Sequence, residues 1–245
     1  MSLARRPLLA FAGLALLPFA RSAAAGTLVK GSGVAANERR DIGAFVGVGL
    51  GAPFAVVLRP AAREAIEVVA DDNILALVQT RLEGAGSERR LQIDLPRGTR
   101  IEPRTPVVVT IDYVRVEDLA VGGSGSIAAR SMKAPTLEAA IGGTGKIDLG
   151  DLDAGNLSVA IGAKRAAAAD GKVRTLSVSI GGSGRCDAER LVAGDVSVSV
   201  AGSGDTRVRA ERALRASIAG SGDVYHSGAA IPQVAIVGSG RVKRL

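Results

Sequence analysis

The chain has 245 residues, a formal net charge of +7 at pH 7 and only 2% aromatic residues, with no tryptophan. It therefore lacks the stacking platforms with which proteins hold single-stranded nucleic acid, and we predict no nucleic-acid partner. The single cysteine, Cys186, excludes an internal disulfide, so stability must come from packing and backbone hydrogen bonds.

Residues 1–25 predict an export signal. Arg5 and Arg6 precede an apolar stretch from Leu8 to Ala20, and the small residues 22–25 follow it. This order is typical of a cleaved signal peptide, and the apolar stretch is too short for a retained membrane span. We therefore expect an exported protein that is periplasmic, secreted or associated with the cell surface.

Residues 26–113 form a β-rich N-terminal part in this prediction. Segments such as REAIEVVAD and RRLQIDL alternate apolar and polar residues, which is typical of strands. Between them, DNILALVQTRLEG has the spacing of a short helix, with Asp72 or Asn73 as its N-cap. Two arrangements stay open: these residues are irregular first coils of the array described next, or a separate small module packed against it.

Residues 114–245 repeat a glycine-containing phrase every 18 to 20 residues. The second residue of each phrase is Gly123, Gly143, Gly182, Gly202, Gly220 or Gly238, and a degenerate copy, IGAKR, places Ala163 in the gap. Around each phrase every second residue is apolar, the period of a strand. One unit is too small to bury its own apolar side chains, so the units must stack at about 4.8 Å. The sequence predicts an all-β fold, a right-handed parallel β-helix.

We interpret the six glycines as structural residues at the corners between strands, where glycine tolerates positive φ and close stacking. A phosphate-binding loop would need a lysine and a hydroxyl residue followed by a helix, and strands follow here. The calcium-binding glycine repeat has a nine-residue period, about half of that found. No metal and no cofactor is predicted.

The predicted recognition surface consists of charged residues that point outward. Arg185, Asp205, Asp223 and Arg241 occupy the same position after successive corners and should form a charge ladder on adjacent coils. Lys164 and Arg165 belong to the degenerate corner, which we expect to bulge outward through residues 164–171. The ligand of this surface is unidentified, and a glycan, a cell-wall polymer and a protein all stay open.

No catalytic residue is predicted. His226, the only histidine, and Cys186 both fall in apolar columns, which favours structural roles. The alternative function is a carbohydrate-active enzyme, a polysaccharide hydrolase or lyase, that uses the stacked carboxylates of Asp205 and Asp223. Aromatic platforms for sugar rings are missing, so we favour a protein that binds without catalysis.

A second outward column, on the strand before each corner, holds only small residues: Ala140, Ala160, Ser179, Ser199, Ser217 and Ala235. Such side chains make a flat face that another surface can approach closely. We expect this face to be covered by the N-terminal part or by a second copy of the chain. The alternative is that it merely reflects an alanine-rich composition.

Between Leu28 and Val242 the chain resembles the bacterial family described as putative auto-transporter adhesin, head GIN domain. The resemblance is carried by VKGSGVAANERRDIGAFVGVGL, by EVVADDNILALVQTRLEGAGSERRLQIDL, by the serial GSG corners and by the closing GSGDVYHSGAAIPQVAIVGSGRVKRL. It implies a secreted or surface-associated β-helical protein without established enzymatic activity. We therefore expect an exported, non-enzymatic binding module, adhesin-like or associated with the cell envelope.

Overall fold

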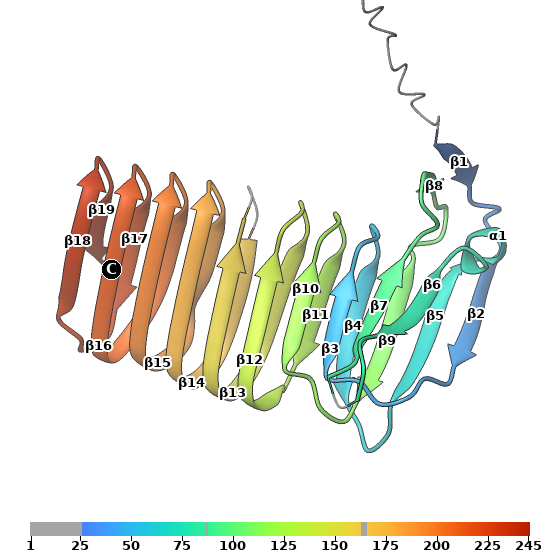
Figure 1. The fold of residues 1–245 in the computed structure, drawn as a ribbon, viewed down its shortest axis with the longest axis horizontal. Coiled ribbons are helices and arrows are strands. Elements are labelled where there is room, and N and C mark those ends of the chain that lie inside the picture. The colour runs from blue at the N-terminus through green and yellow to red at the C-terminus, as the bar shows by residue number, and fades with distance from the viewer. Residues whose placement is uncertain (1–25, 87, 163–165) are drawn as a thin grey trace, which may run out of the picture.

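The computed structural model describes residues 26–86, 88–162 and 166–245, and almost all of its regular structure is strand. Successive coils stack side by side along one axis, from the N-terminal coils to the coil that ends the chain (Figure 1). The prediction of an all-β solenoid is confirmed.

The repeat array begins at β10 (Asp118–Val121) and ends at β19 (Arg241–Arg244). The strands between them are β11 (Ser126–Arg130), β12 (Lys133–Ile141), β13 (Lys146–Ile161), β14 (Ala166–Gly182), β15 (Arg185–Gly202), β16 (Asp205–Gly220), β17 (Asp223–Ser227) and β18 (Pro232–Gly238). All pairings among them are parallel, and Val121, Ile141 and Ile161 follow one another in register. One sequence period is therefore one turn of the solenoid.

The expected outward bulge through residues 164–171 is wrong for the part that the structure describes. Residues 166–171 belong to β14, where Ala167 pairs with Ile147 on one side and Cys186 on the other. Ala167 is buried and fills the apolar column of this coil. The register shifts before Gly171, whose φ of 118° lets the strand absorb the irregularity. Residues 163–165 lie outside the described residues.

The solenoid extends into the N-terminal part through four parallel strands. They are β3 (Gly47–Leu50), β4 (Ala55–Pro60), β7 (Arg90–Asp94) and β9 (Val108–Tyr113). Strand β3 lies between β10 and β7, and β4 lies between β11 and β9. These strands continue the two sides of the array and share its core.

Antiparallel strands cover the N-terminal end of this stack. They are β2 (Ala35–Arg40), β5 (Ala65–Asp71) and β6 (Gln79–Glu83). Strand β5 pairs with β9, β2 pairs with β5, and β6 pairs with β7. A separate pair is formed by β1 (Thr27–Lys30) and β8 (Thr99–Glu102). The N-terminal part therefore lies at the end of the rod (Figure 1).

The predicted helix is correct only in its first turn. Helix α1 spans Asp72–Leu75, and the rest of the predicted segment includes β6, which pairs with β7. Tertiary pairing outweighs a local helical pattern here. The predicted N-cap is also wrong, because Asp71 holds that position and its side chain caps no helix N–H. Its carboxylate instead accepts backbone hydrogen bonds from Gly33, Arg104 and Thr105.

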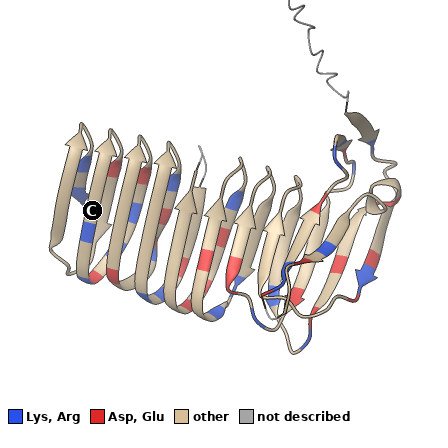
Figure 2. Ribbon diagram, viewed as in Figure 1, with Lys and Arg blue, Asp and Glu red and all other residues tan. Residues whose placement is uncertain are grey.

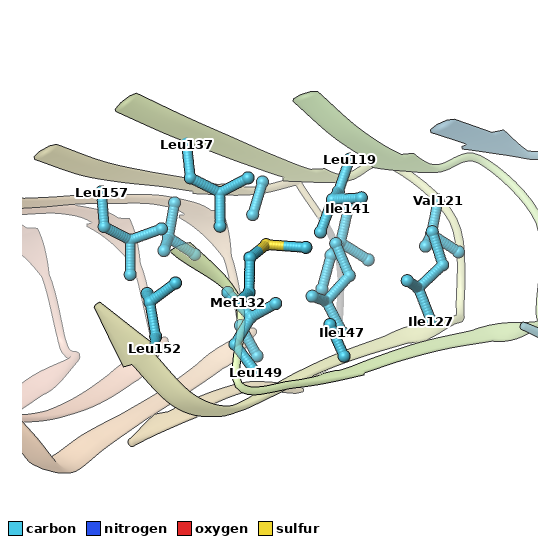
Figure 3. Close-up of a cluster of buried hydrophobic side chains, with 14 of the residues drawn as sticks. Leu119, Val121, Ile127, Met132, Leu137, Ile141, Ile147, Leu149, Leu152 and Leu157 are labelled. Carbon is cyan, nitrogen blue, oxygen red and sulfur yellow. The ribbon is translucent and has the colours of Figure 1, made fainter. Parts of the chain in front are cut away.

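The core lies between the two sides of the coils, where apolar side chains from the strands before and after each corner meet. Figure 3 shows this layer around Met132, which is fully buried. The labelled side chains around it are Leu119, Val121, Ile127, Leu137, Ile141, Ile147, Leu149, Leu152 and Leu157. Because inward and outward residues alternate, the outward residues of successive coils form columns on two outer faces, one on the segment before each corner and one on the segment after it. Over the described ranges, no helix is long and apolar enough to span a membrane.

Candidate recognition surface

The six repeat glycines lie at the corners, where a positive φ, crowding between coils or both require glycine. Gly182, Gly202, Gly220 and Gly238 have φ of 130°, 132°, 135° and 126°, a conformation that L side chains rarely adopt. Gly123 and Gly143 do not have positive φ. A Cβ on Gly123 would overlap the carbonyl oxygen of Gly51, and one on Gly143 would overlap those of Gly122 and Gly123. Crowding between coils therefore requires glycine at these two positions.

The structure brings Arg185, Asp205 and Asp223 together on the outer face of β15, β16 and β17. The Arg185 guanidinium lies 3.5 Å from the Asp205 carboxylate. The backbone N–H of Asp223 donates to Asp205 Oδ1 at 3.3 Å. Arg241 continues the column in register with Asp223, and no ion pair among the described residues involves it. Lys164 and Arg165 lie outside the described residues.

Three further residues complete this surface, and the sequence analysis missed them. Arg207, Tyr225 and Lys243 form the neighbouring outward column, two residues further along each strand. Arg207 Cζ and Lys243 Nζ lie 5.5 Å and 5.3 Å from the centre of the Tyr225 ring. The column spacing that revealed Asp205 and Asp223 would have revealed these residues too. We call both columns together the polar ladder: Arg185, Arg207, Asp205, Asp223, Tyr225, Arg241 and Lys243.

Asp223 is the centre of the polar ladder. Lys243 Nζ donates to its carboxylate at 2.9 Å and the Tyr225 hydroxyl at 3.2 Å. The hydrogen bond from Lys243 lowers the pKa of Asp223 and outweighs the opposing effect of burial, while Asp223 raises the pKa of Lys243. Both groups are charged at neutral pH. Asp223 thus connects the Lys243 and Tyr225 side chains through its carboxylate.

The stacked carboxylates differ from an acid–base pair. Glycoside hydrolysis needs one carboxyl with a raised pKa as the proton donor. The pKa of Asp223 is lowered instead, and Asp205 is paired with Arg185. The ring of Tyr225 lies between two cations, which occupy the faces that a sugar would stack on. The arrangement is suited to binding polar or charged groups in an ordered row.

His226 and Cys186 lie in the core columns. His226 is 5% exposed and stands in register between Val208 and Arg244. Burial lowers its pKa, and the Arg244 charge adds to this. Cys186 is buried, and burial with the nearby Asp187 charge raises the pKa of its thiol to about 12. Among the residues described, no cluster of His, Cys, Asp and Glu could hold a metal ion.

The face of small residues is open. Ala140, Ala160, Ser179, Ser199, Ser217 and Ala235 are all exposed. The N-terminal strands stack onto the end of the solenoid, so they extend this side of the rod and do not lie over it. The expectation that the N-terminal part covers this face is therefore wrong.

Comparison with known proteins identifies the family. The model of the family described as putative auto-transporter adhesin, head GIN domain, matches residues 44–230. The chain belongs to this family. The match begins just before β3 and ends after β17, so it includes most of the polar ladder but not Arg241 and Lys243. No curated protein matches the chain.

Several solved structures have the same fold as this chain along nearly its whole described length. A putative adhesin from Bacteroides fragilis is 19% identical, with a TM-score of 0.78, and 89% of this chain covers 100% of that one. A putative lipid binding protein from Parabacteroides distasonis is 22% identical, with a TM-score of 0.71 and the same coverage. A putative adhesin from Parabacteroides merdae is 17% identical, with a TM-score of 0.64, and the chains are covered to 89% and 99%. At these identities the likeness establishes the fold.

Proposed function

We propose that the protein is an exported, non-enzymatic binding module with an adhesin-like role at the bacterial envelope, and that the polar ladder holds its ligand. Membership of the adhesin family supports the adhesin-like role. The observation that carries the proposal is the arrangement around Asp223, where Lys243 and Tyr225 fix a carboxylate between two outward columns. The ligand is a glycan, a cell-wall polymer or a protein that offers polar groups in a row.

The strands make this surface ready to bind. Arg185, Asp205 and Asp223 follow one another at the strand spacing of about 4.8 Å. The Asp205 carboxylate already accepts hydrogen bonds from the Arg185 guanidinium and from the backbone N–H of Asp223, so little further ordering of Asp205 is needed when a ligand binds. A polymer lying along the solenoid axis would meet a new charged group at every coil.

The test is binding of the chain that starts at residue 26 to arrays of bacterial glycans, host glycans, cell-wall polymers and envelope proteins. We expect at least one class to bind, and the variant Asp223→Ala to weaken that binding at least tenfold. Asp153→Ala is the matched control, because Asp153 forms a similar exposed ion pair with Lys172 at 3.3 Å away from the ladder. Equal loss in both variants, or no loss in either, would reject the ladder as the binding surface.

The competing function is a carbohydrate-active enzyme, which the stacking of Asp205 and Asp223 favours. A panel of polysaccharides with a reducing-end assay separates the two functions. We expect no new reducing ends. Turnover that disappears in the double variant Asp205→Asn, Asp223→Asn would replace the binding proposal with the enzymatic one.

Export is tested separately. Residues 1–25 have the order of basic, apolar and small residues that signal peptides share. Expression in a bacterium with two membranes should place the protein outside the cytoplasm, with its N-terminus near Gly26. A cytoplasmic protein of full length would contradict export.

A further inference from the structure

We infer that the face of small residues is a self-association surface that joins two copies of the chain. This inference goes beyond the proposed function, because the face lies on the segment of each coil that precedes the glycine corner and the polar ladder lies on the segment that follows it. It holds whatever the ladder binds.

Three outward columns make up this face, on strands β10, β12, β13, β14, β15, β16 and β18. The central column runs through Ala120, Ala140, Ala160, Ser179, Ser199, Ser217 and Ala235. The column nearer the corner holds Gly122, Gly142, Gly162, Gly181, Ala201, Ala219 and Val237. The third column holds Asp118, Glu138, Ser158, Ser177, Ser197, Arg215 and Gln233. Charges therefore stand in one column only, and the rest of the face is flat and uncharged.

The charged column is self-complementary. Ser177 lies at its centre, with Glu138 two strands away on one side and Arg215 two strands away on the other. Neither charge takes part in an ion pair among the described residues. Asp118, one strand beyond Glu138, is already paired with Arg90. The two unpaired charges are thus opposite in sign and equally far from the centre.

A two-fold axis that runs along the strand of Ser177 uses this symmetry. It lays one copy face down on the other, keeps each column over itself and reverses the order of the coils. Glu138 of each copy then faces Arg215 of the other, Ser158 faces Ser197, and Ser177 faces itself. Both ion pairs form at once, which is the mark of an isologous interface.

The size of the face suits a dimer. Three columns span about 20 Å, and the stacked strands extend over about 30 Å, so each copy contributes roughly 600 Å². Two copies would bury about 1,200 Å², the lower bound of stable protein interfaces. Glycine, alanine and serine let the two sheets approach more closely than the ~10 Å that larger side chains require. Charged residues in the outer column then fix the register.

The experiment measures molar mass by light scattering after size exclusion, with the chain that starts at residue 26. We expect a dimer, and we expect Glu138→Arg and Arg215→Glu each to raise the dissociation constant at least tenfold, because each places like charges opposite one another. The double variant Glu138→Arg, Arg215→Glu should restore the dimer. The control Glu189→Arg makes the same charge change on an exposed residue of β15 outside this face, and should leave the mass unchanged.

Mixing the two single variants gives the sharpest result. A Glu138→Arg copy and an Arg215→Glu copy are complementary at both ends, so the mixture should form a heterodimer that neither variant forms alone as a homodimer. A wild-type chain that stays monomeric would overturn the inference, as would a dimer that is unaffected by both single variants, Glu138→Arg and Arg215→Glu. Testing the same variants on the arrays of glycans, cell-wall polymers and envelope proteins distinguishes loss of the dimer from loss of binding to the polar ladder.

Discussion

The corner at Gly202 offers the most direct test of why the repeat needs glycine. Its φ is 132°, and the carbonyl group of Gly182 lies where a Cβ of this residue would stand. In the substitution Gly202→Ala the new Cβ would lie 3.0 Å from the carbonyl carbon of Gly182 and would overlap its oxygen. The substitution therefore introduces backbone strain and a clash between neighbouring coils together.

The magnitude follows from these two contributions. A side chain held in a sparsely populated positive-φ conformation costs about 1–3 kcal/mol. Forcing one extra carbon into a packed contact costs about 1–3 kcal/mol more. We expect the free energy of unfolding to fall by roughly 2–6 kcal/mol, out of a total that is typically 5–15 kcal/mol. Urea denaturation followed by circular dichroism measures this as a lower midpoint concentration.

The neighbouring corner provides the control. Gly181 has no positive φ, and a Cβ built on it meets no atom of the described residues within 4 Å. Gly181→Ala should therefore change the free energy of unfolding by about 0.5 kcal/mol or less. If Gly202→Ala and Gly181→Ala unfold at the same urea concentration, the stacking account of the corner glycines fails.

Three further substitutions test the core and the N-terminal end. Thr206→Val should raise the free energy of unfolding by roughly 1 kcal/mol, seen in urea denaturation, because the buried Thr206 hydroxyl has no hydrogen-bond partner in the part of the chain that the structure describes. His226→Val should remove a pH dependence of the free energy of unfolding. Burial lowers the pKa of His226, so the unfolded chain binds more protons than the folded chain and wild-type stability falls as the pH drops below about 6.5. Denaturation curves at pH 5 and 7.5 should show this loss in the wild type and not in the variant. In Asp71→Ala the backbone N–H groups of Gly33, Arg104 and Thr105 lose their acceptor, so hydrogen exchange should speed up at these amides while the amides of β14 to β16 keep their protection.

The array could be predicted because its inward columns obey one rule. Each apolar side chain of a column packs against the one on the preceding coil, as in the column Val121, Ile141, Ile161 and Ile180. A change in the repeat length would leave an apolar side chain without this neighbour. The spacing of about twenty residues therefore predicts both where the strands lie and how they pair in register. The stack itself follows from the smallness of one coil.

The N-terminal end could not be derived in the same way. Residues 79–83 carry a helical pattern, yet they form β6 because β7 offers an unpaired edge. That edge comes from folding of the solenoid and leaves no mark in the local sequence. The carboxylate of Asp71 joins two loops, one through Gly33 and one through Arg104 and Thr105, and these contacts cannot be seen before the chain folds. The structure that caps the solenoid therefore depends on long-range contacts that the local sequence does not reveal. The structure of a repeat, in contrast, can be predicted by comparing it with the repeats next to it in the sequence.

The candidate surfaces consist of outward-facing residues, whose identity the packing of the repeat does not determine. Packing dictates the inward residues of every coil, but it places no demand on the outward ones. If outward residues had drifted at random, the strands before and after the corner would carry the same mixture. They do not: the first side carries Ser179 and its small neighbours, and the second carries Asp205, Asp223 and Lys243. The two outer faces of the scaffold therefore differ in chemistry, and the proposed dimer and the proposed ligand surface depend on that difference.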